Sequence, residues 1–188
     1  MKKTVLITGA SKGIGAATAK LFGAAGYRVA VNFNHSLSDA EAVKNSIIKD
    51  GGEAEIFQAD VADYLSVKSM AEAVNARFGR VNVLVANAGI SLVKQADRTS
   101  AEEWNKLFAV NAKGVHNAVN AVIGDMIDVK NGRIIAVSSV WGEVGASCEV
   151  AYSASKAAVI GYVKALAKEL APSGITVNCV SQIGRAHV

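Results

Sequence analysis

The sequence is poor in proline and cysteine, with one proline and two cysteines among its 188 residues. It also has no low-complexity tract, and 51% of its residues are hydrophobic, which together exclude a disordered or collagen-like chain. The two cysteines, Cys148 and Cys179, exclude a disulfide framework and form no Cys-x-x-Cys pair. We therefore predict a globular domain that needs no disulfide and has no metal site.

Long apolar runs and blocks of basic residues are absent too. No run approaches the roughly 18–20 apolar residues of a membrane-spanning helix. The apolar start of the chain stops at Thr8 and Gly9, so it predicts a first strand rather than a secretory signal. The 20 Lys and Arg residues outnumber the 16 Asp and Glu residues but are scattered, which gives no indication of nucleic-acid binding. We expect a cytoplasmic protein with no membrane or nucleic-acid partner.

What the sequence does contain is a regular alternation of strand and helix patterns. Predicted strands cover residues 4–8, 28–33, 53–58, 81–86, 132–138 and 175–180. Predicted helices cover residues 14–25, 38–50 with Ser38 as N-cap, 64–78, 101–127 behind a capping box of Ser100 and Glu103, and 152–170. The nearly continuous apolar strands are typical of a parallel sheet with helices on both faces. We predict an α/β fold: a Rossmann-type, doubly wound parallel sheet in three layers, its six strands in the order 3-2-1-4-5-6, within one domain of residues 1–181.

A glycine-rich turn follows the first predicted strand and leads directly into a helix. Its glycines have the spacing Gly-x-x-x-Gly-x-Gly, in which small residues let the backbone approach a pyrophosphate at the start of the helix. The residues predicted to bind a dinucleotide here are Gly9, Ser11, Lys12, Gly13, Ile14 and Gly15. By itself the turn is also compatible with a purely structural connection between strand and helix.

The end of the second strand is where the ribose of the adenosine would be recognised. The residues there are Asn34, His35 and Ser36, with no carboxylate before Asp39, and Lys12 lies in the glycine turn. An acidic residue at this place suits the 2′-hydroxyl of NAD, whereas a basic neighbour suits the 2′-phosphate of NADP. We therefore predict NADP(H) in preference to NAD(H).

Two further residues follow the third predicted strand. Asp60, followed by Val61, could accept a hydrogen bond from the adenine amine. Spacing alone makes it equally compatible with a carboxylate near the start of the next helix. We include both residues in the predicted nucleotide site.

Ser139, Tyr152 and Lys156 form the predicted catalytic group. Ser139 ends a strand, and Tyr152 and Lys156 are four positions apart on a helix, so their side chains share one face. A tyrosine has a pKa of about 10, and lowering it by roughly three units requires about 4 kcal/mol. One ammonium at about 4 Å in an effective dielectric near 20 supplies about 4 kcal/mol. The same spacing also fits a tyrosine at the edge of the core beside a solvated lysine.

Taken together, the glycine turn from Thr8 to Gly15, the segment Asn87-Ala88-Gly89, and Asn111, Ser139, Tyr152 and Lys156 resemble the short-chain dehydrogenase/reductase family over nearly the whole chain. The resemblance implies a proton relay in which Asn111 holds a water that contacts Lys156. It also implies that Tyr152 is the acid/base, that Ser139 positions the carbonyl, and that Lys156 binds the nicotinamide ribose, so that Tyr152 and Lys156 also contact the cofactor. Asn87, Ala88 and Gly89 would border the cofactor.

Within that family, the segments 7–15 and 138–142 look most like bacterial 3-oxoacyl-[acyl-carrier-protein] reductases. That resemblance implies NADPH-dependent reduction of a 3-oxoacyl thioester and a homotetramer, with acyl carrier protein as a potential partner. Lys130 matches one of the basic positions associated with carrier-protein docking, but Ser173 stands at the other. Two alternatives remain open: a sugar or polyol dehydrogenase with the same catalytic residues, or a catalytically silent nucleotide-binding module.

The end of the sequence departs from the family, whose members usually continue with Pro-Gly, a substrate lid and a seventh strand. Residues 183–188 are those encoded by ATC GGA AGA GCA CAC GTC, which matches a widely used sequencing adapter. We therefore expect residues 182–188 to be a non-native tail and the seventh strand to be missing. The sequence of the source gene would decide this.

Overall fold

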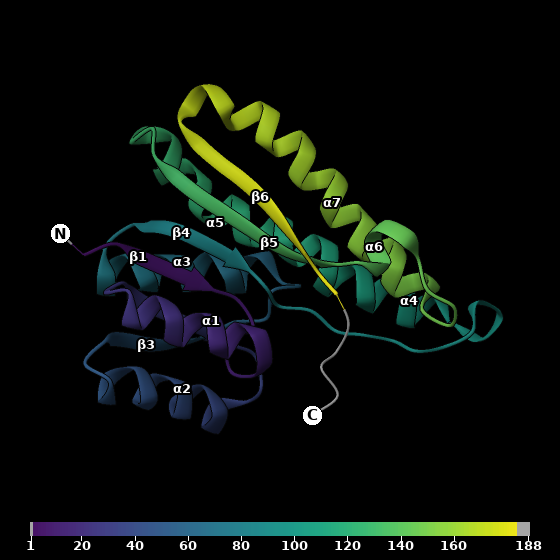
Figure 1. The fold of residues 1–188 in the computed structure, drawn as a ribbon, viewed down its shortest axis with the longest axis horizontal. Coiled ribbons are helices and arrows are strands. Elements are labelled where there is room, and N and C mark those ends of the chain that lie inside the picture. The colour runs from purple at the N-terminus through teal and green to yellow at the C-terminus, as the bar shows by residue number, and fades with distance from the viewer. Residues whose placement is uncertain (1, 184–188) are drawn as a thin grey trace.

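The structure is a computed structural model that describes residues 2–183. A six-stranded, entirely parallel sheet with the strand order β3-β2-β1-β4-β5-β6 forms its centre (Figure 1). The strands are β1 (Thr4–Ile7), β2 (Arg28–Phe33), β3 (Glu53–Gln58), β4 (Val81–Ala86), β5 (Gly132–Ser139) and β6 (Ile175–Gln182). The predicted α/β class and strand order are confirmed.

Helices connect the strands and cover both faces of the sheet. The long ones are α1 (Gly13–Ala24), α2 (Leu37–Lys49), α3 (Tyr64–Phe78), α4 (Ala101–Phe108), α5 (Gly114–Asp128) and α7 (Val150–Leu170). The short ones are α6 (Trp141–Val144), the 3₁₀ turns η1 (Ala96–Arg98) and η3 (Ala171–Ser173), and the π-helical turn η2 (Ala109–Lys113).

The three layers follow from the alternation of side chains along each strand, which sends successive residues to opposite faces. In β1, Val5 and Ile7 join the core formed with α1 and α2, whereas Leu6 joins the core formed with α3, α5 and α7. In β4, Val83 likewise belongs to the core formed with α1 and α2, and Leu84 belongs to the core on the other face. Because both faces are covered, the central strands need apolar residues at most positions, as the sequence has.

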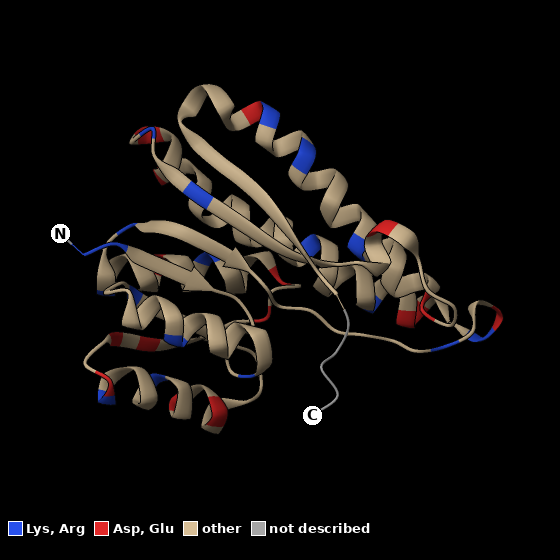
Figure 2. Ribbon diagram, in the orientation of Figure 1, with Lys and Arg blue, Asp and Glu red and all other residues tan. Residues whose placement is uncertain are grey.

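Apart from Lys156, which is buried, the charged residues in the described part of the chain lie outside this apolar centre. Figure 2 shows basic and acidic positions interspersed over the helices, with both signs on α2. Within residues 2–183, no helix has the length and apolar character that a bilayer span needs. In the same residues, no group of three or more His, Cys, Asp or Glu side chains is placed to hold a metal ion.

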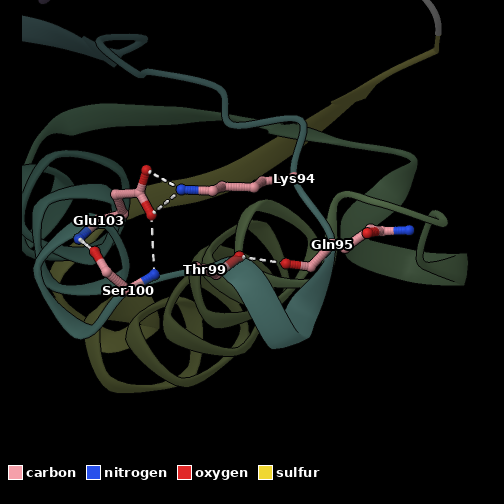
Figure 3. A network of polar contacts seen from close by, with 5 residues as sticks. All are labelled: Lys94, Gln95, Thr99, Ser100 and Glu103. Atoms are coloured by element: carbon pink, nitrogen blue, oxygen red, sulfur yellow. Dashed lines mark hydrogen bonds and ion pairs between the residues drawn. The ribbon is translucent and has the colours of Figure 1, made fainter.

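The predicted capping box at the start of α4 is present. The hydroxyl of Ser100 accepts a hydrogen bond from the Glu103 backbone N–H, and the Glu103 carboxylate accepts one from the Ser100 N–H (Figure 3). The same carboxylate pairs with the ammonium of Lys94 at 2.7 Å, and the Lys94 N–H donates to the carbonyl oxygen of Cys148. These contacts anchor the loop between β4 and α4 to the segment that precedes α7.

Several boundaries differ from the prediction. The helix expected at 101–127 is α4 followed by η2 and α5, because a π-helical turn interrupts the regular spacing. The N-cap of α2 is Ser36 instead of Ser38, and α7 begins at Val150 instead of Tyr152. Strand β6 continues to Gln182, which pairs with Ser139, so the first residue of the expected tail lies in the sheet. Residues 184–188 of that tail lie outside the described residues.

Gly15 lets α1 pack directly behind the turn that precedes it. A Cβ at Gly15 would lie 2.6 Å from the Asn87 amide nitrogen and 2.9 Å from the Cα of Ala10, and would collide with the Gly9 carbonyl oxygen. At Gly124, in an exposed position of α5, a Cβ would meet nothing within 4 Å. Of these two glycines, only Gly15 is therefore required by packing.

We predict that Gly15→Ala lowers the free energy of unfolding by roughly 1–3 kcal/mol, because the added methyl group overpacks backbone atoms that cannot move freely. Gly124→Ala, the matched control, should raise it by roughly 0.5–1 kcal/mol because alanine favours a helix. Urea denaturation of both variants and the parent measures this. Equal effects of the two substitutions would contradict the packing assignment.

Candidate active site

The turn between β1 and α1 is held against the segment that follows β4. At Gly9, where φ is +62°, a Cβ would lie 2.8 Å from the Cα of Ala88, so no larger residue fits. The Asn87 amide donates to the carbonyl oxygens of Thr8 and Gly9 at 2.9 and 3.1 Å. The Thr8 hydroxyl accepts from the backbone N–H groups of Asn87 and Ala88, both at 3.0 Å. The predicted glycine turn and the Asn87-Ala88-Gly89 segment therefore form one unit.

The other side of this turn is open. Gly13 has a φ of +54°, and a Cβ built there would meet nothing within 4 Å. Helix α1 begins at Gly13 with no side-chain cap from Lys12 and no acidic residue in its first turn. Its first N–H groups and the positive end of its dipole are thus suited to a bound anion such as a pyrophosphate.

A cavity of about 1140 Å³ opens in front of this turn, at the carboxyl edge of the sheet. Small-molecule sites commonly occupy roughly 300–1,000 Å³, so the space fits a ligand as large as a dinucleotide. Twelve of the predicted cofactor residues line it: Gly9, Ser11, Lys12, Gly13, Ile14, Asn34, His35, Asp60, Val61, Asn87, Ala88 and Gly89. Gly15 instead packs behind the turn, and Ser36 is the N-cap residue of α2.

Tyr152 and Lys156 line a second, smaller cavity of about 160 Å³. The two cavities share five lining residues, Ile14, Asn87, Gly89, Ile90 and Gln182, so the smaller one adjoins the larger. The Lys156 ammonium lies 5.8 Å from the centre of the Tyr152 ring, on its face. The one-face arrangement predicted from their spacing in α7 is present, at the edge of the sheet where ligands bind in such folds.

Lys156 is buried, with only 5% of its surface exposed. Its ammonium donates to the carbonyl oxygen of Val137 in β5 at 2.9 Å, and the hydroxyl of Ser138 donates to the Lys156 carbonyl at 2.9 Å. Burial lowers the pKa of Lys156 from 10.5 to about 8, because desolvation penalises the charged form. At neutral pH the side chain is still protonated and places a positive charge beside the Tyr152 ring.

Asn111 lies in the π-helical turn η2 and is fully buried. Its amide oxygen accepts from the Ile90 N–H at 2.8 Å, and its nitrogen donates to the Ile90 carbonyl and to the Ser155 hydroxyl at 2.9 and 3.0 Å. A Cβ at Gly89 would lie 3.3 Å from the Asn111 oxygen and 3.5 Å from the Lys156 nitrogen. Gly89 thus lets the chain pass close to both the Asn111 amide and the Lys156 ammonium. A π-helical turn such as η2, which carries Asn111, is frequent at functional sites.

Ser139 is the last residue of β5 and is 4% exposed. Its hydroxyl oxygen accepts from the Trp141 N–H at 3.3 Å. Of the neighbouring pair, Ser138 rather than Ser139 lines the smaller cavity. The structure therefore brings Tyr152, Lys156 and Asn111 together, and it places Ser139 at the end of β5, next to the cavity-lining Ser138.

Comparison with known protein families identifies the family of this chain. The model for the short chain dehydrogenase family matches residues 3–183. This chain belongs to the short-chain dehydrogenase family. It is 43% identical over 179 residues to a 3-oxoacyl-[acyl-carrier-protein] reductase of Synechocystis, covering 95% of this chain and 72% of that protein. It is 43% identical over 181 residues to the corresponding reductase of Staphylococcus aureus, covering 96% of this chain and 74% of that protein.

A solved structure of this short-chain dehydrogenase family also matches. It is a metagenomic short-chain oxidoreductase in complex with NADP, with a TM-score of 0.91 and 34% sequence identity. The match covers 95% of this chain and 81% of that one. The Rossmann-type fold of this chain therefore matches the fold of a relative that was solved with NADP.

In this short-chain dehydrogenase, sequence reasoning missed Asn32. It is 1% exposed, lines the large cavity and accepts from the Gly9 N–H at 3.1 Å. Its nitrogen donates to the carbonyl oxygens of Phe57 and Ala59 at 3.2 and 3.1 Å. It therefore joins the glycine turn to the wall that carries Asp60. A polar residue inside the apolar run of β2 was the available signal, because a buried amide requires partners.

Lys106 and Val110, on α4 and η2, also line the large cavity and were not predicted. These two residues reach the cavity because the region from α4 to α5 runs along Val61. A Cβ at Gly114 would lie 2.8 Å from a Val61 methyl group, and the Asn117 amide donates to the Val61 carbonyl oxygen at 2.8 Å. No local pattern signals this, because the contact depends on how α4 docks on the sheet.

We predict that burial of Lys156 makes stability depend on pH in a defined window. The unfolded chain keeps the Lys156 proton up to about pH 10.5 and the folded chain only up to about pH 8, so the unfolded state binds more protons between these values. The free energy of unfolding should therefore rise across this window relative to Lys156→Met, by up to about 3 kcal/mol at 1.36 kcal/mol per unit. Below pH 8 the difference should be constant. Urea titrations of both proteins measure it, and a difference that stays flat up to pH 10.5 would contradict the assignment.

Proposed function

We propose that this chain is an NADP(H)-dependent oxidoreductase that reduces the carbonyl group of a 3-oxoacyl thioester to an alcohol. The observation that carries the proposal is the position of Tyr152 and Lys156 in a small cavity that adjoins the glycine-lined large one. The relatives named as 3-oxoacyl-[acyl-carrier-protein] reductases and the NADP-bound relative support the same reading.

The large cavity offers a fitting partner for each part of the cofactor. The open turn at Gly13 and the start of α1 would take the pyrophosphate. Lys12, with Asn34 and His35, would take the adenosine 2′-phosphate, and Asp60 would accept from the adenine amine. When bound, NADPH supplies the hydride that is added to the carbonyl carbon.

The residues of the chain manage the proton that goes to the carbonyl oxygen. Tyr152 donates its phenolic proton, and the adjacent Lys156 ammonium stabilises the phenolate that results. Ser139, next to the cavity-lining Ser138, would donate its hydroxyl proton to the substrate carbonyl while its oxygen accepts from the Trp141 N–H. Asn111, fixed by Ile90 and Ser155, would hold the water through which the proton on Tyr152 is restored.

The thioester substrate is supported by the two reductases at 43% identity. If acyl carrier protein docks here, Lys130 would supply a positive charge for an acidic partner. Lys130 lies next to the segment that contains Ser173, since a Cβ at Gly174 would be 2.6 Å from the Lys130 carbonyl oxygen. Because Ser173 is uncharged, the carrier protein would be held less strongly than by two basic residues.

The experiment is NADPH oxidation with acetoacetyl-CoA. Tyr152→Phe should reduce kcat by roughly 10²–10⁴-fold through loss of general-acid catalysis, while NADPH binding changes by no more than about twofold. Tyr64→Phe, at an exposed tyrosine at the start of α3, is the matched control and should retain full activity.

Three results would argue against the proposal. Undiminished turnover by Tyr152→Phe would remove the proton-donor role. Dinucleotide binding by the parent without turnover of any carbonyl would leave only a nucleotide-binding module. Turnover of polyols with NADP⁺, but not of acetoacetyl-CoA with NADPH, would replace the substrate class.

A further inference from the structure

A carboxylate faces the cation that the proposed function assigns to the 2′-phosphate. The Lys12 ammonium and a carboxylate oxygen of Asp39 are 3.0 Å apart, and both side chains are substantially exposed, at 68% and 42%. Lys12 lines the large cavity from the glycine turn, and Asp39 lies in the first turn of α2. The ion pair therefore joins the glycine turn, where Lys12 lines the cavity, to the first turn of α2.

This pair sits where the ribose of the adenosine is recognised. Asn34 and His35, which follow β2 directly, line the cavity, and α2 begins only two residues later. Asp39 lies in α2 and therefore does not occupy the position at the end of β2 where an acidic residue would bind the 2′-hydroxyl of NAD. The first turn of α2 nevertheless returns its carboxylate to the side of Lys12.

The charges predict opposite effects on the two dinucleotides. A 2′-phosphate carries nearly two negative charges at neutral pH. It would be attracted by the Lys12 ammonium but repelled by Asp39, which also has to give up its partner. The 2′-hydroxyl of NADH carries no charge, so the same pair affects its binding little.

We propose that Asp39 is a specificity-determining residue that weakens the preference for NADPH by occupying Lys12 and repelling the 2′-phosphate. The proposal rests on the proposed function, which places the adenosine ribose beside Lys12. With Asp39 present, the ratio of the affinities for NADPH and NADH is smaller than Lys12 alone would give. A change of this one exposed side chain would therefore change the ratio.

The test is a set of dissociation constants for NADPH and NADH, measured by calorimetry at low ionic strength, where exposed charges are least screened. Asp39→Asn should tighten NADPH binding by roughly three- to fivefold, the upper part of the range expected for exposed charge pairs, and change NADH binding by less than about twofold. Lys12→Met should weaken NADPH binding selectively. In the Lys12→Met background, Asp39→Asn should yield a clearly smaller gain, because the ion pair is already lost.

Two further variants control the experiment. Glu41→Gln removes the same charge from an exposed position two residues further along α2 and should leave the ratio of the two constants unchanged. Asp39→Ser, like Asn a residue that suits a helix start, should repeat the effect of Asp39→Asn, so that a poorly folded single variant does not decide the outcome.

The outcomes separate this proposal from the one it rests on. If the parent binds neither dinucleotide, the proposed function fails, and this proposal fails with it. If the parent binds both, and neither Asp39 variant tightens NADPH, only the role of Asp39 is overturned. Weakened NADH binding by Asp39→Asn would show that the carboxylate accepts from the 2′-hydroxyl instead, which also overturns the role proposed here.

Discussion

One buried ammonium determines how the site of this protein can be built. Lys156 loses most of its hydration in the fold, and the cost appears as a pKa lowered to about 8. The Val137 carbonyl compensates part of that cost at the end of β5, and Ser138 ties the backbone of Lys156 to the same strand. Helix α7 and strand β5 are therefore held in the one arrangement that puts the charge beside Tyr152. Lys156, Val137 and Ser138 all line the small cavity, so these contacts set its shape beside Tyr152.

Three neutral amides hold loops of the candidate site in place. Asn87 joins the glycine turn to the end of β4, and Asn32 joins the same turn to the end of β3. Asn111 joins the π-helical turn to Ile90. An amide group can both donate and accept, so these side chains satisfy backbone groups of the loops they contact without adding charge. The positive potential of Lys156 and of the start of α1 is thus left for a bound anion.

The strands were predictable from the sequence because a parallel sheet covered on both faces requires apolar runs that local patterns reveal, as in β4 and β2. Their order was predictable because strands that alternate with helices form a doubly wound sheet. The pairing of Tyr152 with Lys156 was predictable for the same reason, since it depends on a spacing within one helix. The π-helical turn at Asn111 was not predictable, because the turn depends on contacts with Ile90 and Ser155 that are distant in the sequence. The same holds for the ion pair of Asp39. The tetramer implied by the family resemblance stays a prediction.

In the proposed reaction, the nicotinamide end of the cofactor would meet Tyr152 and Lys156 in the small cavity. The decisive measurement is a crystal structure of this chain with NADP⁺ bound. We expect the hydroxyls of the nicotinamide ribose within hydrogen-bond distance of the Lys156 ammonium, and the Tyr152 hydroxyl beside the nicotinamide ring. A nicotinamide directed away from α7, with Lys156 still bonded only within the protein, would contradict it.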